Sequence, residues 1–210
     1  MSESLPFWER GYADPTAEVF GSAPSEDVVA CASFLPRGAR VLDAGCGEGR
    51  NALWLASQGH CVDAVDISTR GIAKLLSRAG QAGLEVRAWV GDLSNLDLDG
   101  EYDLIVCHGV LHLLHKEPAV HAVRRFQAHT RQGGANVICV FTNRVPCPPD
   151  LVAITPALWG EGELPELYAG WRMTAHRAYV FEDDHPGGVH HTHAAERVTA
   201  WKQGTGSCAP

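Results

Sequence analysis

The sequence lacks the features that mark several classes of protein. It has no run of about 18 consecutive apolar residues, so we expect no membrane span. It has no basic cluster, and its formal net charge of −8 makes nucleic acid a poor candidate partner. The first residues contain no basic segment followed by an apolar one. We therefore expect no secretory signal and favour a cytoplasmic location.

Cysteine pairs of the CxxC type are also absent, although the chain has seven cysteines. The odd number and the missing pairing pattern favour reduced thiols over a disulfide framework. Cys61, Cys107 and Cys139 fall in predicted buried strands, where free cysteine behaves as a small hydrophobic residue. We interpret the cysteines, Cys208 included, as structural, and keep only Cys147 under consideration for chemistry.

Short apolar segments alternate with amphipathic ones over residues 25–142. Strands are predicted over 39–45, 61–67, 86–92, 102–110 and 135–142, and helices over 26–35, 50–59, 69–83 and 118–134. Strands that alternate with helices imply right-handed crossovers and a parallel sheet with helices on both faces. The sequence therefore predicts an α/β fold with a doubly wound, mostly parallel sheet.

The pattern changes after Thr142. Residues 143–156 are rich in proline and predict an irregular excursion, and 163–171 predict a short helix. Two strands follow over 172–182 and 190–202. The Pro-Gly-Gly sequence between them predicts an antiparallel β-hairpin, which completes a seven-stranded sheet.

Three glycines stand in five positions after the first predicted strand, within DAGCGEGRN over 43–51. In an open parallel sheet, ligands bind where the strands end. We therefore expect Gly45, Cys46 and Gly47 to line a crevice, with Arg50 and Asn51 at the start of the next helix, where N–H groups are free. Glycine tolerates positive φ and lets a ligand approach the backbone.

Two ligand classes use such a loop. A dinucleotide places its pyrophosphate on G-x-G-x-x-G/A, which residues 47–52 match. However, the tight turn begins at Gly45, and the carboxylates of Asp43 and Glu48 would repel a pyrophosphate. They favour a ligand that carries positive charge, such as S-adenosylmethionine with its amino group and its sulfonium. The loop therefore favours a methyl donor over a nicotinamide.

Two further carboxylates end predicted strands. Asp66 ends the second, where an acid can accept hydrogen bonds from both ribose hydroxyls, and Asp92 ends the third, where a carboxylate can accept from an adenine amino group. Either one alone would also fit a helix cap or a solvated loop. Acids at the ends of three successive strands, beside a glycine loop, favour ligand binding.

With these residues in this order, the sequence resembles the class I S-adenosylmethionine-dependent methyltransferases over nearly its whole length. The resemblance implies the strand order 3-2-1-4-5-7-6 with strand seven antiparallel. It also assigns parts of the cofactor to residues that follow the strands: the methionine end to the backbone at Asp43, Gly45 and Gly47, the ribose to Asp66 with Ile67, the adenine to Asp92 with Leu93, and the methyl group to the surroundings of Cys107 and His108.

A closer resemblance, to the tellurite-resistance (TehB-like) methyltransferases, is carried by GCGEGRNALWLASQG, VGDLSNLDLDGEYDLIV, VPCPPD and EGELPELYAGW. It implies a small-molecule acceptor such as tellurite, selenite or another chalcogen compound or thiol-like nucleophile. In that family a His-Arg pair and a further arginine are expected in the terminal hairpin. Here the hairpin has histidines and no arginine in that pairing. Because imidazole does not replace a bidentate guanidinium, the acceptor stays open.

Four histidines cluster in the predicted hairpin: His185, His190, His191 and His193. Along a strand, His191 and His193 share one face and His190 faces the other way. The H-x-H pair could position an acceptor, act as a base or bind a metal. Nearby residues complete no recognisable metal spacing, so we assign no metal ligand. Ion pairs with Asp183, Asp184 or Glu196, or plain solvation, explain the cluster equally simply.

The acceptor decides whether a base is needed. A selenium, tellurium or sulfur centre has a lone pair free at pH 7, whereas a hydroxyl or amine would need a histidine base. The catalytic candidates are His191, His193 and His108, with His112 as a further possible base.

The aromatic residues of FWERGYADP precede the core. Trp8 and Tyr12 could close over the cofactor or could simply attach the terminus to the core, and we predict a lid. The expected organisation is one domain over 1–210, with a lid segment (1–24), a cofactor-binding core (25–142) and an acceptor-side loop, helix and hairpin (143–210). We expect a monomer or homodimer. A catalytically silent cofactor-binding module stays an alternative, and a nicotinamide oxidoreductase is disfavoured by Asp43.

Overall fold

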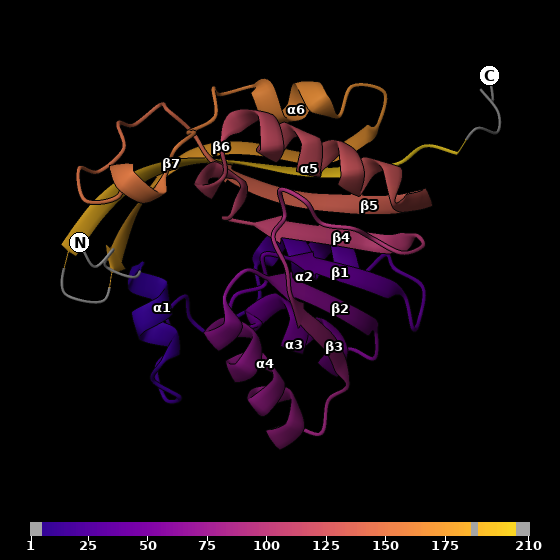
Figure 1. Cartoon of the computed structure of the whole chain (residues 1–210). Helices are drawn as coiled ribbons and strands as arrows, with labels where there is room; N and C mark the ends of the chain where they lie inside the picture. The colour runs from indigo at the N-terminus through magenta and orange to yellow at the C-terminus, as the bar shows by residue number, and fades with distance from the viewer. Residues whose placement is uncertain (1–5, 186–188, 205–210) are drawn as a thin grey trace.

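A computed structural model describes residues 6–185 and 189–204. Its centre is a seven-stranded sheet with the order β3-β2-β1-β4-β5-β7-β6 (Figure 1). Five strands are parallel: β1 (Arg40–Ala44), β2 (Cys61–Asp66), β3 (Val86–Val90), β4 (Tyr102–His108) and β5 (Thr130–Phe141). β7 (Val189–Trp201) is antiparallel to both β5 and β6 (Arg172–His185). The predicted fold, strand order and terminal hairpin are confirmed.

Helices cover both faces of the sheet. One face carries α2 (Glu26–Ala32), α3 (Arg50–Ser57) and α4 (Thr69–Gln81). The other carries α5 (Lys116–Ala128) and the short α6 (Glu163–Leu167). Two 3-10 turns, η1 (Leu111–Leu113) and η2 (Val152–Ile154), lie in connections, and α1 (Phe7–Tyr12) lies beside α4 (Figure 1). None of the helices in the described part of the chain combines the length and the apolar character that a membrane span requires.

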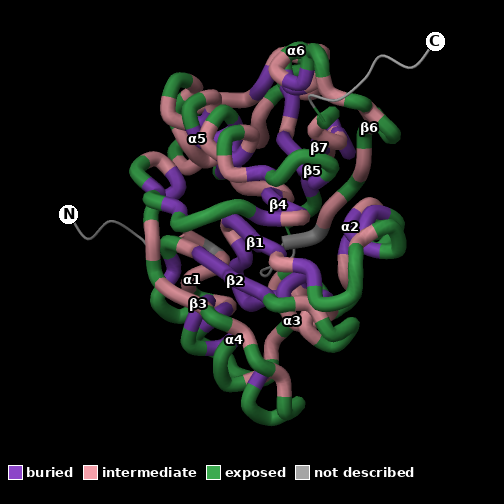
Figure 2. Tube along the Cα trace, turned by 90° about the vertical axis from the view of Figure 1, so that its right-hand side faces the viewer, coloured by how far each residue is buried: buried purple, intermediate pink, exposed green. Residues whose placement is uncertain are grey.

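The sheet separates two hydrophobic cores. In β1, Val41 packs with residues of α2, α3 and α4, whereas Leu42 packs with residues of α5, because successive side chains of a strand point to opposite faces. β4 is apolar over most of its length and is largely buried, as a strand in the middle of a covered parallel sheet should be. Figure 2 shows the central strands as mostly buried and the outer helix surfaces as exposed.

The boundary between α5 and β5 differs from the prediction. We expected the helix to continue to Gly134, but it ends at Ala128 and β5 begins at Thr130. The Thr130 hydroxyl donates to the Phe126 carbonyl oxygen at 2.7 Å, which closes the last helical turn. A Cβ on Gly134 would lie 2.9 Å from the Asp103 carbonyl oxygen, so this glycine allows the chain to pass close to β4 as a strand.

The cysteines within the described residues form no disulfide, and Cys208 lies outside those residues. Cys107 and Cys139 are buried in strands as predicted. Cys61 is exposed, contrary to the prediction, because it is the first residue of β2 and precedes the covered part of the strand.

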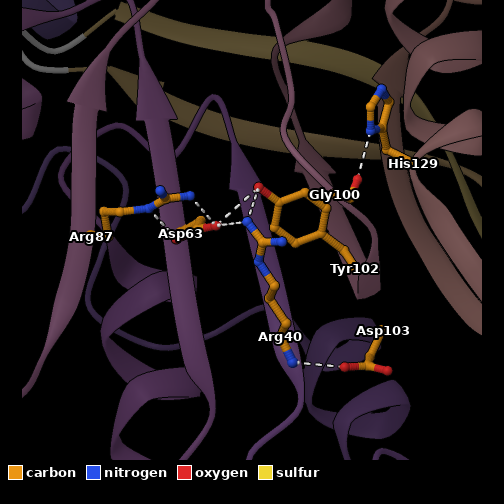
Figure 3. Close-up of polar contacts among 7 residues, drawn as sticks. All are labelled: Arg40, Asp63, Arg87, Gly100, Tyr102, Asp103 and His129. Carbon is orange, nitrogen blue, oxygen red and sulfur yellow. Dashed lines mark hydrogen bonds and ion pairs between the residues drawn. The ribbon is translucent and has the colours of Figure 1, made fainter.

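A polar cluster joins four neighbouring strands near their amino-terminal ends (Figure 3). The Asp63 carboxylate on β2 accepts hydrogen bonds from Arg87 Nη2 at 2.6 Å, the Tyr102 hydroxyl at 2.9 Å and Arg40 Nη2 at 3.1 Å. Burial raises the pKa of Asp63, but these three donors outweigh burial and hold it below its ordinary value. The cluster fixes β1, β2, β3 and β4 relative to one another at the edge opposite the site.

Candidate active site

A cavity of about 690 Å³ opens at the carboxyl ends of the parallel strands. This volume falls in the range of about 300–1,000 Å³ that small-molecule sites occupy. Its loop half, as we name it, is lined by Trp8, Tyr12, Asp43, Gly45, Cys46, Gly47, Arg50, Asn51, Asp66 and Ile67. Its hairpin half is lined by His112, Cys139, Phe141, residues 145–158 in part, Tyr179, Phe181, His193 and Arg197.

The glycine loop packs tightly against the rest of the chain. Gly45 and Gly47 have φ values of 77° and 54°, in the left-handed region. A Cβ on Gly45 would lie 2.4 Å from a methyl group of Val110, and one on Gly47 would lie 2.5 Å from the Tyr12 hydroxyl oxygen. Val110 and Tyr12 of the protein itself therefore leave no room for side chains at these two glycines. From the sequence we expected a bound ligand to require that space.

Asp43 is a deeply buried acid of the loop half. It is 2% exposed, and its Oδ2 atom has no hydrogen-bond partner among the residues that the structure describes. Burial raises the pKa of Asp43 to about 7, although Arg50 and a backbone hydrogen bond from Ala52 oppose the shift. Burying a carboxylate in this way is costly. The arrangement fits a ligand that brings a cationic group to the cavity.

Asp66 connects the end of β2 to the glycine loop. Its Oδ2 accepts from the Gly47 N–H at 2.8 Å, and its Oδ1 accepts from the Ser68 N–H at 2.8 Å. Each oxygen retains a second lone pair for a ligand hydroxyl. Ile67 lines the cavity beside Asp66 and is 66% exposed, so a ligand in the loop half would cover a large apolar side chain.

Glu48 lines the cavity as predicted, but its carboxylate is already paired within the protein. Its side chain is 2% exposed, and its Oε2 lies 2.8 Å from Lys74 Nζ and 3.4 Å from Arg78 Nη1. Its Oε1 accepts from the Val19 N–H at 2.6 Å. Because two cations of α4 already neutralise Glu48, the charge argument for a cationic ligand rests on the other acids of the loop half.

The segment at the N-terminus of the described chain forms one wall of the cavity. Tyr12 is 6% exposed and Trp8 lines the same half. Burial raises the pKa of the Tyr12 hydroxyl, and the nearby Asp66 and Glu48 add to the shift. Lys74 Nζ donates to the Ala17 carbonyl oxygen at 2.6 Å, so the residues after α1 are held to α4. Closure of this segment over a cofactor stays a prediction.

Cys46 and Asn51 line the cavity and also have structural contacts. Asn51 is 4% exposed, and its Oδ1 accepts from the Ser25 N–H at 2.8 Å, which joins the start of α2 to α3. The Cys46 thiol lies 3.7 Å from the Gly47 carbonyl oxygen and is almost wholly buried. Both residues therefore support the shape of the loop.

Three predicted cofactor residues lie away from the cavity lining. Asp92 is exposed and its Oδ1 accepts from the Ser94 N–H at 2.8 Å, while Leu93 is 5% exposed and packs in the core. Their adenine-binding role stays a prediction. Cys107 is completely buried in the core, and its place beside the methyl group stays a prediction. Residues alternate along β4, and it is His108 that faces the cavity.

His108 lies between two charged groups. Its Nδ1 is 3.4 Å from Arg50 Nη2 and its Nε2 is 3.5 Å from Asp27 Oδ2. Burial lowers the pKa of His108, although Asp27 opposes the shift. The neutral tautomer with the proton on Nε2 matches both neighbours. The Nδ1 lone pair then faces the Arg50 guanidinium, and the catalytic role of His108 stays a prediction.

The hairpin histidines follow the predicted strand alternation. His191 and His193 are each 5% exposed, whereas His190 is exposed. His191 Nε2 lies 3.0 Å from Asp150 Oδ1, an ion partner from the 143–156 excursion that the sequence analysis did not consider. His193 lines the cavity, and the side chain of His185 lies outside the described residues. No set of three metal-ligating side chains occurs among the residues that the structure describes.

Five rings form a continuous surface, the aromatic wall: His112, Phe141, Tyr179, Phe181 and His193. His112 stacks on Phe141 with a centroid distance of 4.0 Å and an interplanar angle of 6°. Phe141 lies 4.9 Å from His193 and 5.6 Å from Phe181, which lies 5.7 Å from Tyr179. Burial lowers the pKa of His112 to about 3, and His193 adds to the shift, so His112 is a neutral ring in the wall.

Arg197 on β7 is a cavity residue that the sequence analysis missed. Its guanidinium carbon lies 4.9 Å from the Tyr179 ring centroid, and its Nε has no hydrogen-bond partner within the described part of the chain. The signal was available, because residues 191, 193 and 197 are separated by even numbers and so share one face of a strand. The hairpin does bring an arginine to the site.

Comparisons with known proteins agree with this geometry. A family model described as "Tellurite resistance protein TehB" matches residues 20–199. A probable S-adenosyl-L-methionine-dependent methyltransferase TehB of Haemophilus influenzae is 32% identical over 149 residues, which are 70% of this chain and 50% of that protein. The chain thus spans about half the length of the curated relatives that it matches first.

Solved structures show the same fold. The crystal structure of TehB from Haemophilus influenzae superposes with a TM-score of 0.78 and 27% identity, covering 87% of this chain and 64% of that one. The 1,6-didemethyltoxoflavin-N1-methyltransferase of Burkholderia thailandensis superposes with a TM-score of 0.63 and 27% identity, covering 84% and 76%. That structure contains bound 1,6-didemethyltoxoflavin and S-adenosylhomocysteine.

Proposed function

Because this chain belongs to the TehB family of tellurite resistance proteins, we propose that it is an S-adenosylmethionine-dependent methyltransferase that acts on a small molecule. The observation that carries the proposal is Asp43, a buried carboxylate whose Oδ2 is hydrogen-bonded by none of the described residues and which lines a ligand-sized cavity. The names of the relatives and the S-adenosylhomocysteine bound in a structural neighbour support it.

The loop half of the cavity fits this cofactor. When bound, S-adenosylmethionine supplies a methyl group on a positively charged sulfonium. Asp43 would attract its ammonium group, Asp66 would accept from the ribose hydroxyls, and Ile67 would be covered by the adenosine. Tyr12 would exclude water from this half, which strengthens the electrostatic contacts. We further propose that residues 1–24 act as the lid and that residues 143–210 form the acceptor side.

Methyl transfer requires little of the protein beyond alignment of the reacting groups. Holding the nucleophile, the methyl group and the leaving sulfur in line supplies most of the acceleration. A chalcogen oxyanion such as tellurite or selenite, or a thiol-like nucleophile, fits the family name and needs no base. A small organic hydroxyl or amine is the second candidate, favoured by the aromatic wall, and His193 with His191 behind it would supply the base.

We also propose that the protein acts in the cytoplasm as a monomer or homodimer. Release of S-adenosylhomocysteine tests the proposed activity with any acceptor, because this product forms whichever nucleophile is methylated. Selenite, tellurite, thiols and small phenols form the first acceptor panel. Release with at least one of them is expected, and a protein that binds S-adenosylmethionine yet releases no product with any acceptor would instead be a silent binding module.

Asp66→Ala, with the exposed Asp99→Ala as its matched control, tests the assignment of the cofactor site. The first substitution removes an acceptor for ligand hydroxyls and the two bonds that hold the loop. The KM for S-adenosylmethionine should rise by about tenfold or more, which corresponds to about 1.4 kcal/mol. The control should keep the wild-type KM. An unchanged KM in Asp66→Ala would remove that residue from the cofactor site.

A further inference from the structure

We propose that the hairpin half of the cavity binds a planar aromatic acceptor with an ionisable hydroxyl group, which stacks on the aromatic wall while Arg197 holds the hydroxylate. This inference rests on the proposed methyl transfer and names its acceptor class. It follows from three properties of the hairpin half: its ring surface, its charge and its position relative to the loop half.

The surface of the hairpin half is built to contact an apolar planar molecule. The aromatic wall presents contiguous rings, and His112 contributes as a neutral ring because burial disfavours its protonation. The 143–158 loop adds aliphatic and proline side chains, namely Val145, Pro146, Pro148, Leu151, Ile154 and Leu158. Aromatic rings gain from offset or edge contacts with such a surface. An oxygen-rich anion would instead lose hydration where it meets the phenyl rings and aliphatic side chains, which donate no hydrogen bonds.

The cationic charge of the hairpin half matches one anionic oxygen, although the acidic residue Asp183 also lines the cavity. Among the described residues that line this half, Arg197 is the one arginine or lysine. Its Nε has no hydrogen-bond partner among those residues, and its guanidinium lies at the Tyr179 end of the wall, where Cys139 and the Asp27 carboxylate also act on it. A guanidinium holds an aryloxide through a charge-assisted hydrogen bond. Its positive charge also favours ionisation of the hydroxyl, so the nucleophile would exist as the anion near neutral pH.

The position of Arg197 brings that oxygen to the junction of the two halves. The charge of Arg197 acts on both His108 and Asp27, and His108 lies 3.4 Å from Arg50 of the loop half. In the transfer, the aryl hydroxyl gives its proton to His193, the base proposed above, and its oxygen forms the new bond to the methyl carbon. The electron pair of the broken carbon–sulfur bond stays on sulfur, which leaves S-adenosylhomocysteine and a neutral aryl methyl ether.

The first experiment compares Arg197→Gln with Arg177→Gln. Arg177 is the register partner of Arg197 and also lies over the Tyr179 ring, at 5.0 Å, but it is exposed and is not part of the cavity lining. Initial rates of S-adenosylhomocysteine release are measured with naphthol, hydroxyquinoline, cyclohexylmethanol, selenite and tellurite. We expect the rates with naphthol and hydroxyquinoline, the two planar hydroxyl compounds, to exceed those with the other three acceptors by at least about tenfold. A tenfold ratio corresponds to about 1.4 kcal/mol.

Arg197→Gln should lower kcat/KM for the planar hydroxyls by about 10- to 100-fold and shift the rising limb of the pH profile to higher pH. Arg177→Gln should change kcat/KM by less than about twofold. Equal effects of the two substitutions would overturn the role of Arg197. Methylation of selenite or tellurite but not of the planar hydroxyls would overturn the acceptor class.

A second pair of variants tests the wall itself. Phe141→Leu removes the ring that stacks on His112, whereas Phe34→Leu changes a ring that is 77% exposed and lies outside the cavity. The KM for the planar hydroxyls should rise by about tenfold in the first variant and stay constant in the second. An unchanged KM in Phe141→Leu would overturn the stacking.

Calorimetric titration of each variant with S-adenosylmethionine separates this inference from the proposed function. The variants should bind the cofactor as the wild-type protein does, which also shows that they are folded. If the wild-type protein fails to bind S-adenosylmethionine, the proposed function fails. If it binds and releases product with other acceptors only, the acceptor inference alone fails.

Discussion

At the scale of single residues, Asp43 restricts most strongly which charge a ligand of this cavity can carry. An ionised carboxylate that is 2% exposed costs free energy in the absence of a counter-charge. Its folded pKa of about 7 lies above the ordinary value of about 3.9, so the free energy of unfolding should fall as the pH rises from about 4 to about 7 and change little above that. A bound ammonium group would offset this cost, which gives the buried acid a functional reason.

The pH dependence of cofactor affinity follows from the same residue. Asp43 is largely protonated at pH 6 and largely ionised at pH 8, so the Kd for S-adenosylmethionine should fall by about tenfold over this interval. The neighbouring groups that affect its pKa are Arg50 and Asp66. Calorimetry at both pH values measures the change. In Asp43→Asn the affinity should be weaker and nearly independent of pH between 6 and 8. An equally steep slope in that variant would assign the titration to another group.

At the scale of secondary-structure elements, Glu48 links α3, α4 and the segment that follows α1. It lies in the turn before α3, pairs with Lys74 on α4 and accepts from the Val19 N–H. Sequence patterns could not reveal this link, because its partners come from a helix and a segment that are distant in sequence. Its acidic character suggested a ligand contact, whereas the structure shows an internal ion pair.

Glu48→Gln should release the segment over residues 13–21. Removing one partner of a buried ion pair costs about 3 kcal/mol, because Lys74 keeps an uncompensated charge. Hydrogen exchange of this segment should become faster, and the KM for S-adenosylmethionine should rise. The exposed Glu85→Gln is the matched control and should change neither quantity. Unchanged exchange in Glu48→Gln would show that other contacts hold the segment.

The cluster around Asp63 is the second inter-element link, at the opposite ends of the strands. Asp63→Asn should lower the free energy of unfolding by about 2–3 kcal/mol, because two arginines and a tyrosine lose a charged acceptor. In the wild type, this stabilisation is present above pH 4 and is lost as the pH falls through the lowered folded pKa of Asp63.

Urea denaturation at pH 7 and at pH 3 measures how much the free energy of unfolding differs between Asp63→Asn and the wild type. Asp99→Asn is the exposed control. The difference should be large at pH 7 and smaller at pH 3. The same difference at both pH values would contradict the electrostatic origin.

At the scale of the whole molecule, the sequence predicted the architecture well. Alternating apolar and amphipathic segments, together with the Pro-Gly-Gly hairpin connection, were enough for the strands, and the family resemblance supplied their order. The end of α5 was placed too late because the close passage of Gly134 against β4 is a tertiary contact. The loop half of the site was largely anticipated, since acids and glycines follow the strands in sequence.

The hairpin half was anticipated less well. Its ring wall combines residues of η1, β5, β6 and β7, which strand patterns cannot bring together. The ion pair of His191 with Asp150 crosses from the hairpin to a proline-rich segment in the same way. Arg197 is the exception, because period-two alternation from His193 places it on the cavity side.

The central claim is that the loop half receives a ligand with a positive charge. Isothermal titration calorimetry of the wild-type protein with S-adenosylmethionine and with NAD tests it most directly. We expect S-adenosylmethionine to bind at one site per chain, with weaker binding in Asp43→Asn, and NAD not to bind. Binding of NAD without S-adenosylmethionine would contradict it.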